Sequence, residues 1–220
     1  MKRLPFSVMK PRLMQKPSVF SVQAPGQFRR KRKTERAAVV MNATTNAADH
    51  PLHKEIGGIL KTLEIDVPGC TVILDEACGG SQHIQYLFPG CARSNASRAC
   101  NGDALVLMNG DRRIEVEVEE SDLRPINFMG KAMASRGCQY IDGGKAYQPD
   151  ERGITVVHIV NTNKPEKISQ LRFVEPAVQK ILDASGQNFV YVIFYGTVED
   201  FRQEEHRQEL LEYLKQVLTA

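Results

Sequence analysis

The sequence lacks several features that would place it in a membrane or secreted class. No apolar run approaches the roughly 20 residues that cross a bilayer, and no signal-type apolar segment precedes the cysteines. The five cysteines are odd in number and do not form the short pairs that zinc knuckles use. A phosphate loop is excluded as well, because no Gly-Lys pair directly follows Gly79, Gly80 and Ser81. We therefore expect a soluble, cytoplasmic protein with reduced thiols and no membrane partner.

Acidic residues are absent from the first 34 positions, which hold ten of the 29 Lys and Arg of the chain. The remainder has 19 basic against 26 acidic residues. Scattered prolines and the lack of an apolar period predict that residues 1–48 form a flexible basic arm. Three explanations of the arm stay open: a tether for nucleic acid, an organellar targeting segment, and a translation start at Met41.

The length of 220 residues and ordinary apolar and charged contents, 42% and 25%, predict a single domain over residues 49–220. Its patterning predicts, in order, a helix from residue 50, a strand over 71–76, a loop over 89–102, a hairpin of 104–108 and 114–118, a helix after 125, a strand over 154–160, a helix over 165–183, a strand over 189–195 and a helix over 199–218. This order is typical of an α/β fold with a mixed central sheet flanked by helices.

Acidic residues gather in the predicted hairpin. Asp103 opens the first strand, and Glu115, Glu117 and Glu119 alternate along the second, so they point to one face while the apolar residues between them point into the core. Like charges on one strand face repel unless something screens them. A divalent cation such as Mg²⁺ would do so, because it prefers carboxylate oxygens.

The turn decides whether these acids can share a metal. A two-residue turn at Asn109 and Gly110 would pair Asp103 with Val116 and leave Glu117 on the other face. A three-residue loop or a bulge would instead place Asp103 opposite Glu117. A shared site therefore requires an odd loop or a bulge in this hairpin.

The segment from Asp103 to Lys131 resembles the PD-(D/E)XK, or restriction-endonuclease-like, nucleases. It has an acid opening one hairpin strand, then Glu-x-Glu-Glu-Ser at 117–121, Arg-Pro at 124–125 and Gly-Lys at 130–131. In that family a helix precedes a three-stranded meander, and a helix and a fourth strand follow, an order similar to that of residues 50–160. The resemblance implies a restriction-endonuclease-like core and a Mg²⁺-dependent nuclease that cleaves DNA.

Carried over to single residues, the resemblance implies that Asp103, Glu117 and Glu119 bind the metal, Mg²⁺ or Mn²⁺. Glu119 stands where the family usually has lysine, a departure that also occurs in some of its members. Lys131 on the following helix would then supply the positive charge. These four residues are the expected catalytic set.

Other interpretations stay open beside this one. Glu76 and Glu55 match acids that some relatives carry before the hairpin and on the first helix, and we rank them lower. The three glutamates also suit a solvated strand face, and His158 suits a satisfied core histidine better than a general base. An inactive nuclease-like module that binds nucleic acid or protein is the alternative function, and a structural subunit is a third. A homodimer is compatible with all of them.

Overall fold

The computed structural model describes residues 50–220, except 122, 143–144, 164 and 185–187. The predicted basic arm, residues 1–48, lies outside the described residues. The helices and strands are α1 (Pro51–Asp66), β1 (Cys70–Leu74), β2 (Gln85–Leu87), β3 (Arg98–Asn101), β4 (Ala104–Met108), β5 (Asp111–Glu119), α2 (Pro125–Gly137), β6 (Gln139–Asp142), β7 (Lys145–Tyr147), β8 (Ile154–Asn161), α3 (Pro165–Leu171), α4 (Val174–Asp183), β9 (Phe189–Gly196), α5 (Val198–Arg202) and α6 (Glu204–Thr219). None of the helices within the described ranges is long and apolar enough to span a bilayer.

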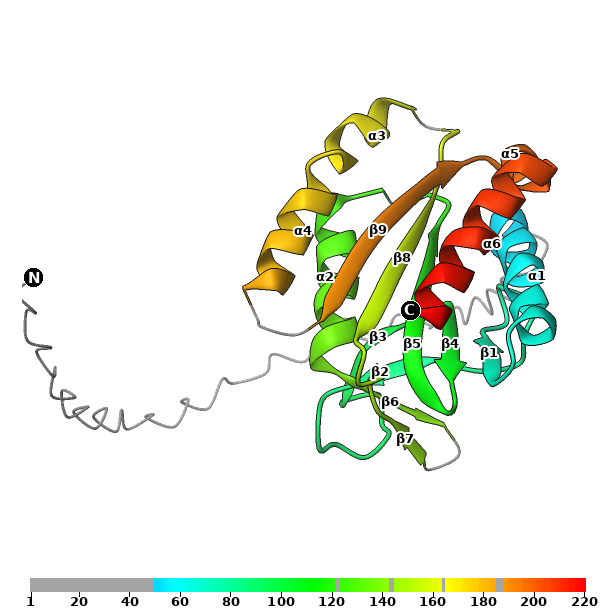
Figure 1. Ribbon diagram of the computed structural model, residues 1–220. Helices are drawn as coiled ribbons and strands as arrows, with labels where there is room; N and C mark the ends of the chain where they lie inside the picture. Colours follow the sequence, from blue (N-terminus) through cyan, green and yellow to red (C-terminus); the bar gives the residue numbers. More distant parts are fainter. Residues whose placement is uncertain (1–49, 122, 143–144, 164, 185–187) are drawn as a thin grey trace, which may run out of the picture. The chain divides into compact units, whose positions relative to one another are not determined.

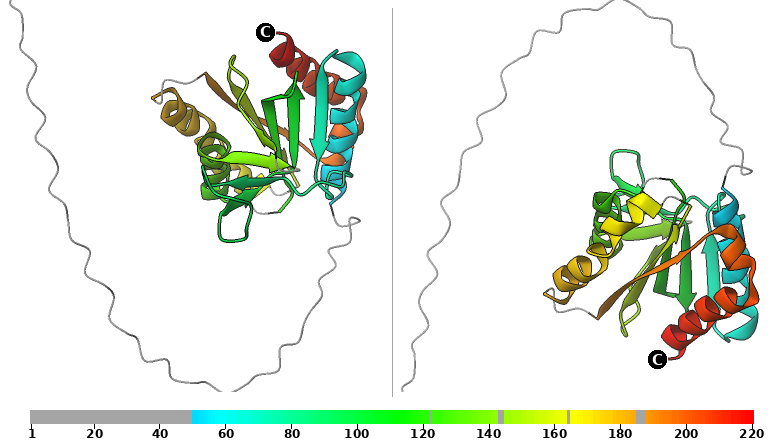
Figure 2. Two further views of the ribbon diagram at one scale, coloured as in Figure 1. Left: turned by 90° about the horizontal axis from the view of Figure 1, so that it is seen from below. Right: turned by 90° about the horizontal axis from the view of Figure 1, so that it is seen from above.

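The central sheet has five strands in the order β1-β4-β5-β8-β9. β1, β4 and β5 form an antiparallel meander, whereas β8 runs parallel to β5 and β9 parallel to β8. Helices α1, α5 and α6 cover one face, and α2, α3 and α4 cover part of the other, as Figures 1 and 2 show from three directions. The predicted α/β fold with a mixed central sheet flanked by helices is therefore confirmed.

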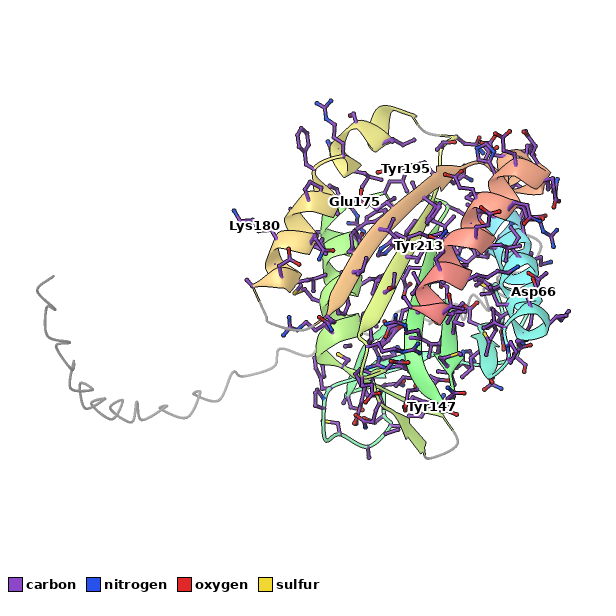
Figure 3. The ribbon with its side chains drawn as sticks, viewed as in Figure 1. Asp66, Tyr147, Glu175, Lys180, Tyr195 and Tyr213 are labelled. Atoms are coloured by element: carbon purple, nitrogen blue, oxygen red, sulfur yellow. The ribbon has the colours of Figure 1, made fainter. Side chains whose placement is uncertain are left out.

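Apolar periodicity explains how α1 and α6 pack on this sheet. Leu52, Ile56 and Leu60 recur at helical spacing on α1, and all three are fully buried. On α6, the ring of Tyr213 lies 5.4 Å from that of Phe194 on β9. Figure 3 labels Tyr213 above the sheet. These contacts pack α1 and α6 against the sheet.

A second sheet, in the order β3-β2-β6-β7, was not predicted. It packs over part of β4, on the same face as α2. Residues 89–102 were predicted to be a loop, yet β3 lies within them. Its four residues, Arg98–Asn101, show no apolar alternation, and pairing with β2 alone defines the strand. The helix predicted over 165–183 is two helices, and the terminal helix is divided at Gln203, whose extended backbone separates α5 from α6.

Two adjacent glycines of α1 should respond in opposite ways to alanine. A Cβ at Gly57 would lie 1.9 Å from the carbonyl oxygen of Cys78, whereas one at Gly58 would meet nothing within 4 Å. Gly57→Ala should therefore lower the free energy of unfolding by about 1–3 kcal/mol through overpacking. Gly58→Ala should raise it by up to about 1 kcal/mol, because alanine favours a helix interior over glycine. Urea unfolding followed by circular dichroism measures both, and equal effects would contradict the close approach of α1 to Cys78.

Candidate functional site

The β4–β5 turn is a two-residue turn followed by a bulge. Asn109 and Gly110 both have positive φ angles, 53° and 94°, as a two-residue turn of this kind requires. The strand register then shifts between Val106 and Leu107. The bulge adds the extra residue that the predicted site requires.

Beyond the bulge, the register brings Asp103 to Glu117. Ala104 pairs with Val116, so the preceding residue, Asp103, faces Glu117 across the two strands. Oδ2 of Asp103 accepts a hydrogen bond of 2.8 Å from the backbone N–H of Val118. The bulge that a shared site requires is therefore present, and the two acids lie on one face.

The glutamate face of β5 is buried, so its interpretation as a solvated strand face is wrong. Glu115 and Glu117 have no exposed surface, and Glu119 is 9% exposed. Glu115 forms a separate ion pair, with its Oε1 2.8 Å from Nη1 of Arg112. The alternation along β5 predicted the shared face, but only tertiary packing shows that it is covered.

Lys131 of α2 joins the three predicted metal ligands. Its Nζ lies 2.6 Å from Oε2 of Glu117, 3.0 Å from Oε1 of Glu119 and 3.8 Å from Oδ2 of Asp103. The structure therefore brings all four predicted site residues together, from the residue before β4, from β5 and from α2.

Burial and neighbouring charges shift the pKa values of this cluster in opposite directions. Burial raises the pKa of Glu117 well above its usual value and also raises that of Glu119, although the Lys131 ammonium acts in the other direction. Burial lowers the pKa of Lys131, but the surrounding carboxylates outweigh this and raise it overall, so the lysine stays protonated. Neither oxygen of Glu117 has a hydrogen-bond partner among the residues that the structure describes, although Oε2 lies in the ion pair with Lys131. Oε1 of Glu117 is therefore a buried acceptor that no described group satisfies.

The donor set of this cluster fits a hard divalent cation. Three carboxylates that surround one positive charge, one of them with an unpartnered buried oxygen, are oxygen ligands of the type that Mg²⁺ and Mn²⁺ prefer. The ammonium of Lys131 stands at the position that the three share. A bound cation would replace that charge, and the flexible lysine stem allows the ammonium to move aside.

A second group beside this cluster was missed from the sequence. His50, His53 and Glu120 place their potential ligand atoms within 4.8 Å of one another, the one such group found within the described ranges. Oε1 of Glu120 accepts hydrogen bonds from the backbone N–H of Leu52, from that of His53, and from Nδ1 of His53, at 2.9, 3.1 and 2.8 Å. Glu120 therefore caps α1 from a distant part of the chain.

His53 links the two groups. With Nδ1 donating to Glu120, its Nε2 lies 3.8 Å from Oδ2 of Asp103. The side chain is 10% exposed, so its position is set by packing as well as by Glu120. The only signal in the sequence was the acid directly after Glu119, together with two histidines three residues apart.

The two lower-ranked acids do not join the site. The side chain of Glu76 is 70% exposed, and Glu55 binds Arg202, 3.3 Å away on the surface. Asp75, one residue earlier than Glu76, is instead half-buried, and burial, with a further contribution from Asp103, raises its pKa.

His158 is a core histidine, but it is not satisfied. It pairs in register with Glu117 and is fully buried, with its ring centroid 4.8 Å from that of Phe128. Neither ring nitrogen has a hydrogen-bond partner in the described part of the chain. Burial lowers its pKa well below the usual value, so the ring is neutral beside the acidic cluster.

Comparison with protein-family models, with curated protein sequences and with solved structures gives no match for this chain. The geometry of the site therefore carries the functional argument.

Proposed function

We propose that this protein is a metal-dependent phosphodiesterase that cleaves DNA, with a restriction-endonuclease-like core of the PD-(D/E)XK type. The order of elements supports the proposal: α1 precedes the meander β1-β4-β5, and α2 and the parallel strand β8 follow. The small sheet formed by β3, β2, β6 and β7 would be an addition to this core.

The observation that carries the proposal is the convergence of Asp103, Glu117 and Glu119 on one positive charge. A two-residue turn alone would have placed Asp103 and Glu117 on opposite faces, and the bulge in β4–β5 prevents this. Buried carboxylates are costly to hold together, and such groups with shifted pKa values cluster at functional sites.

Each residue of the cluster has its own role in the proposed reaction. A metal ion bound by the three carboxylates would lower the pKa of a water molecule and stabilise the charge that develops on the phosphate. Asp103 is held in place by the N–H of Val118, and Glu117 by the strand on which it lies. Lys131, displaced from the carboxylates, would face the phosphate and neutralise part of its charge.

DNA is the proposed substrate because residues 1–34 are strongly basic, which supports the tether for nucleic acid among the three explanations of this segment. The first 34 residues hold ten Lys and Arg and no acid. Such a segment adds affinity for a phosphate backbone through the release of counterions, without regard to base sequence. The body, with more acids than bases, would then contribute the site rather than most of the affinity.

An inactive nuclease-like module is the second candidate, and one observation favours it. Lys131 already lies within 4 Å of an oxygen of each acid, so the cluster is partly neutralised without a metal. Under this alternative the ion pairs would be structural, and the protein would bind nucleic acid without cutting it.

Titration with Mg²⁺ or Mn²⁺ separates the two candidates. Purified protein is incubated with plasmid and with single-stranded DNA, beside the double variant Asp103→Ala/Glu117→Ala, and Mn²⁺ binding is measured by calorimetry. We expect metal-dependent cleavage and metal binding in the native protein, both lost in the variant. Absence of cleavage and of metal binding in the native protein would favour the inactive module.

A further inference from the structure

A cleft of about 730 Å³ opens beside the carboxylate cluster. Glu119 and Lys131 line it, so it is continuous with the proposed catalytic site. The rest of α2 forms one wall, and Phe88, Ala99 and Cys100, around β2 and β3, contribute the other. The volume is within the range of sites that hold small organic molecules.

The cleft exposes apolar side chains that most folds would cover. Phe88 is 52%, Ile126 67% and Met133 38% exposed, three of the eight large apolar side chains that are exposed in the described chain. Gly130 and Gly137 of α2 leave the wall open, since a Cβ at either would meet nothing within 4 Å. An exposed apolar surface of this kind, next to a polar site, is typical of a binding groove.

Two of the segments that contribute to the cleft carry basic but no acidic residues, in contrast to the rest of the body. Residues 77–102 and 124–140 contain no Asp or Glu, although residues 35–220 have 26 acids against 19 bases. Of their basic residues, Lys131 lines the cleft beside Glu119, whereas Arg93, Arg98, Arg124 and Arg136 lie on the same segments outside the lining. The cleft is therefore apolar, and its basic charge comes from Lys131 and from the segments that flank it, which suits a ligand that has a negative backbone and flat apolar groups.

We propose that this groove binds the unstacked bases of single-stranded DNA next to the bond that is cut, an inference that rests on the proposed nuclease function. Phe88 offers a ring for a base to stack on, while the phosphates run along the flanking basic segments toward Lys131. Duplex DNA keeps its bases inside the stack, so it cannot present their faces to this surface. The substrate is therefore single-stranded DNA or a frayed end.

The test is binding without cleavage. Fluorescence anisotropy with EDTA present is measured for a labelled oligothymidylate and for a duplex of the same length. Phe88→Ala should weaken binding of the single strand by about tenfold or more and change duplex binding little, because stacking on an aromatic ring is lost. The control is Phe173→Ala, an aromatic residue with similar exposure, 63%, outside the cleft, and it should leave both affinities unchanged.

A second variant tests the groove without removing a contact. Gly130→Leu fills the wall of the cleft with a residue that favours helices, so the fold should be retained while single-strand binding falls. Tighter binding of the duplex than of the single strand, equal losses on both DNAs, or no loss in Phe88→Ala and Gly130→Leu would overturn the groove.

The DNA-binding test of the groove and the cleavage test of the nuclease can fail independently of each other. Selective single-strand binding without metal-dependent cleavage would contradict the proposed nuclease function but support the binding of single-stranded DNA in the groove. If the protein cleaves DNA but Phe88→Ala has no effect on binding, the nuclease function is supported and the binding of single-stranded DNA in the groove is contradicted.

Discussion

Glutamine in place of Glu117 is expected to lower the rate of metal-dependent DNA cleavage by at least about 100-fold. Glu117 is fully buried, lies 2.6 Å from Nζ of Lys131 and faces Asp103 across the hairpin. Glutamine keeps the size of the side chain but removes the charge that a divalent cation requires. The rate is measured with saturating Mn²⁺, and Mn²⁺ affinity is measured beside it, since the loss should appear in both.

Glu115→Gln is the matched control for this variant. Glu115 lies on the same strand and the same face and is equally buried, but its carboxylate pairs with Arg112 instead of Lys131. We expect it to reduce stability and to leave the cleavage rate per folded molecule within about threefold, because it lies outside the cation site. Equal loss of cleavage in both variants would mean that buried charge on β5, rather than a metal site, sustains the activity.

Methionine in place of Lys131 should destabilise the protein by about 3–5 kcal/mol at neutral pH, because it leaves buried carboxylates without a partner. The pKa of Glu117 is already raised by burial above its usual value of 4.5, and loss of the ammonium raises it further. A carboxyl group with a raised folded pKa favours the folded state below its unfolded pKa, and this contribution is lost as pH rises toward the folded pKa. The stability of the variant should therefore fall more steeply than that of the native protein above about pH 4.5, as urea unfolding at several pH values would show.

Two further measurements test whether the loss of stability in Lys131→Met is specific to the carboxylate cluster. Lys61→Met removes an exposed lysine that lies 3.1 Å from Glu64, and it should change stability by less than about 1 kcal/mol at any of these pH values. Mn²⁺ added to Lys131→Met should restore part of the lost stability, because a divalent cation can replace the missing charge among the same carboxylates. A variant as stable as the native protein at neutral pH would show that the three ion pairs contribute nothing.

The order of the strands of the central sheet along the chain, and the acidic face of β5, were determined by local sequence. Alternating apolar residues along 114–118 require one buried face, so Glu115, Glu117 and Glu119 had to share the other. Helical spacing of apolar residues likewise predicted α1 and α2. The resemblance to PD-(D/E)XK nucleases selected Asp103 and Lys131 from this pattern, and the structure places both beside Glu117 and Glu119.

The tertiary structure decided what no local pattern carries. The bulge between Val106 and Leu107 depends on how the hairpin packs, and without it Asp103 would lie on the wrong face. The contact of Glu120 with His53 joins residues 67 positions apart, so neither residue indicates the other in the sequence. The short segment of β3 becomes a strand only because β2 pairs with it, and the same pairing forms the second wall of the cleft. Alternation along a strand is a local property and can be predicted from sequence, whereas register, burial and distant contacts arise only when the whole chain packs.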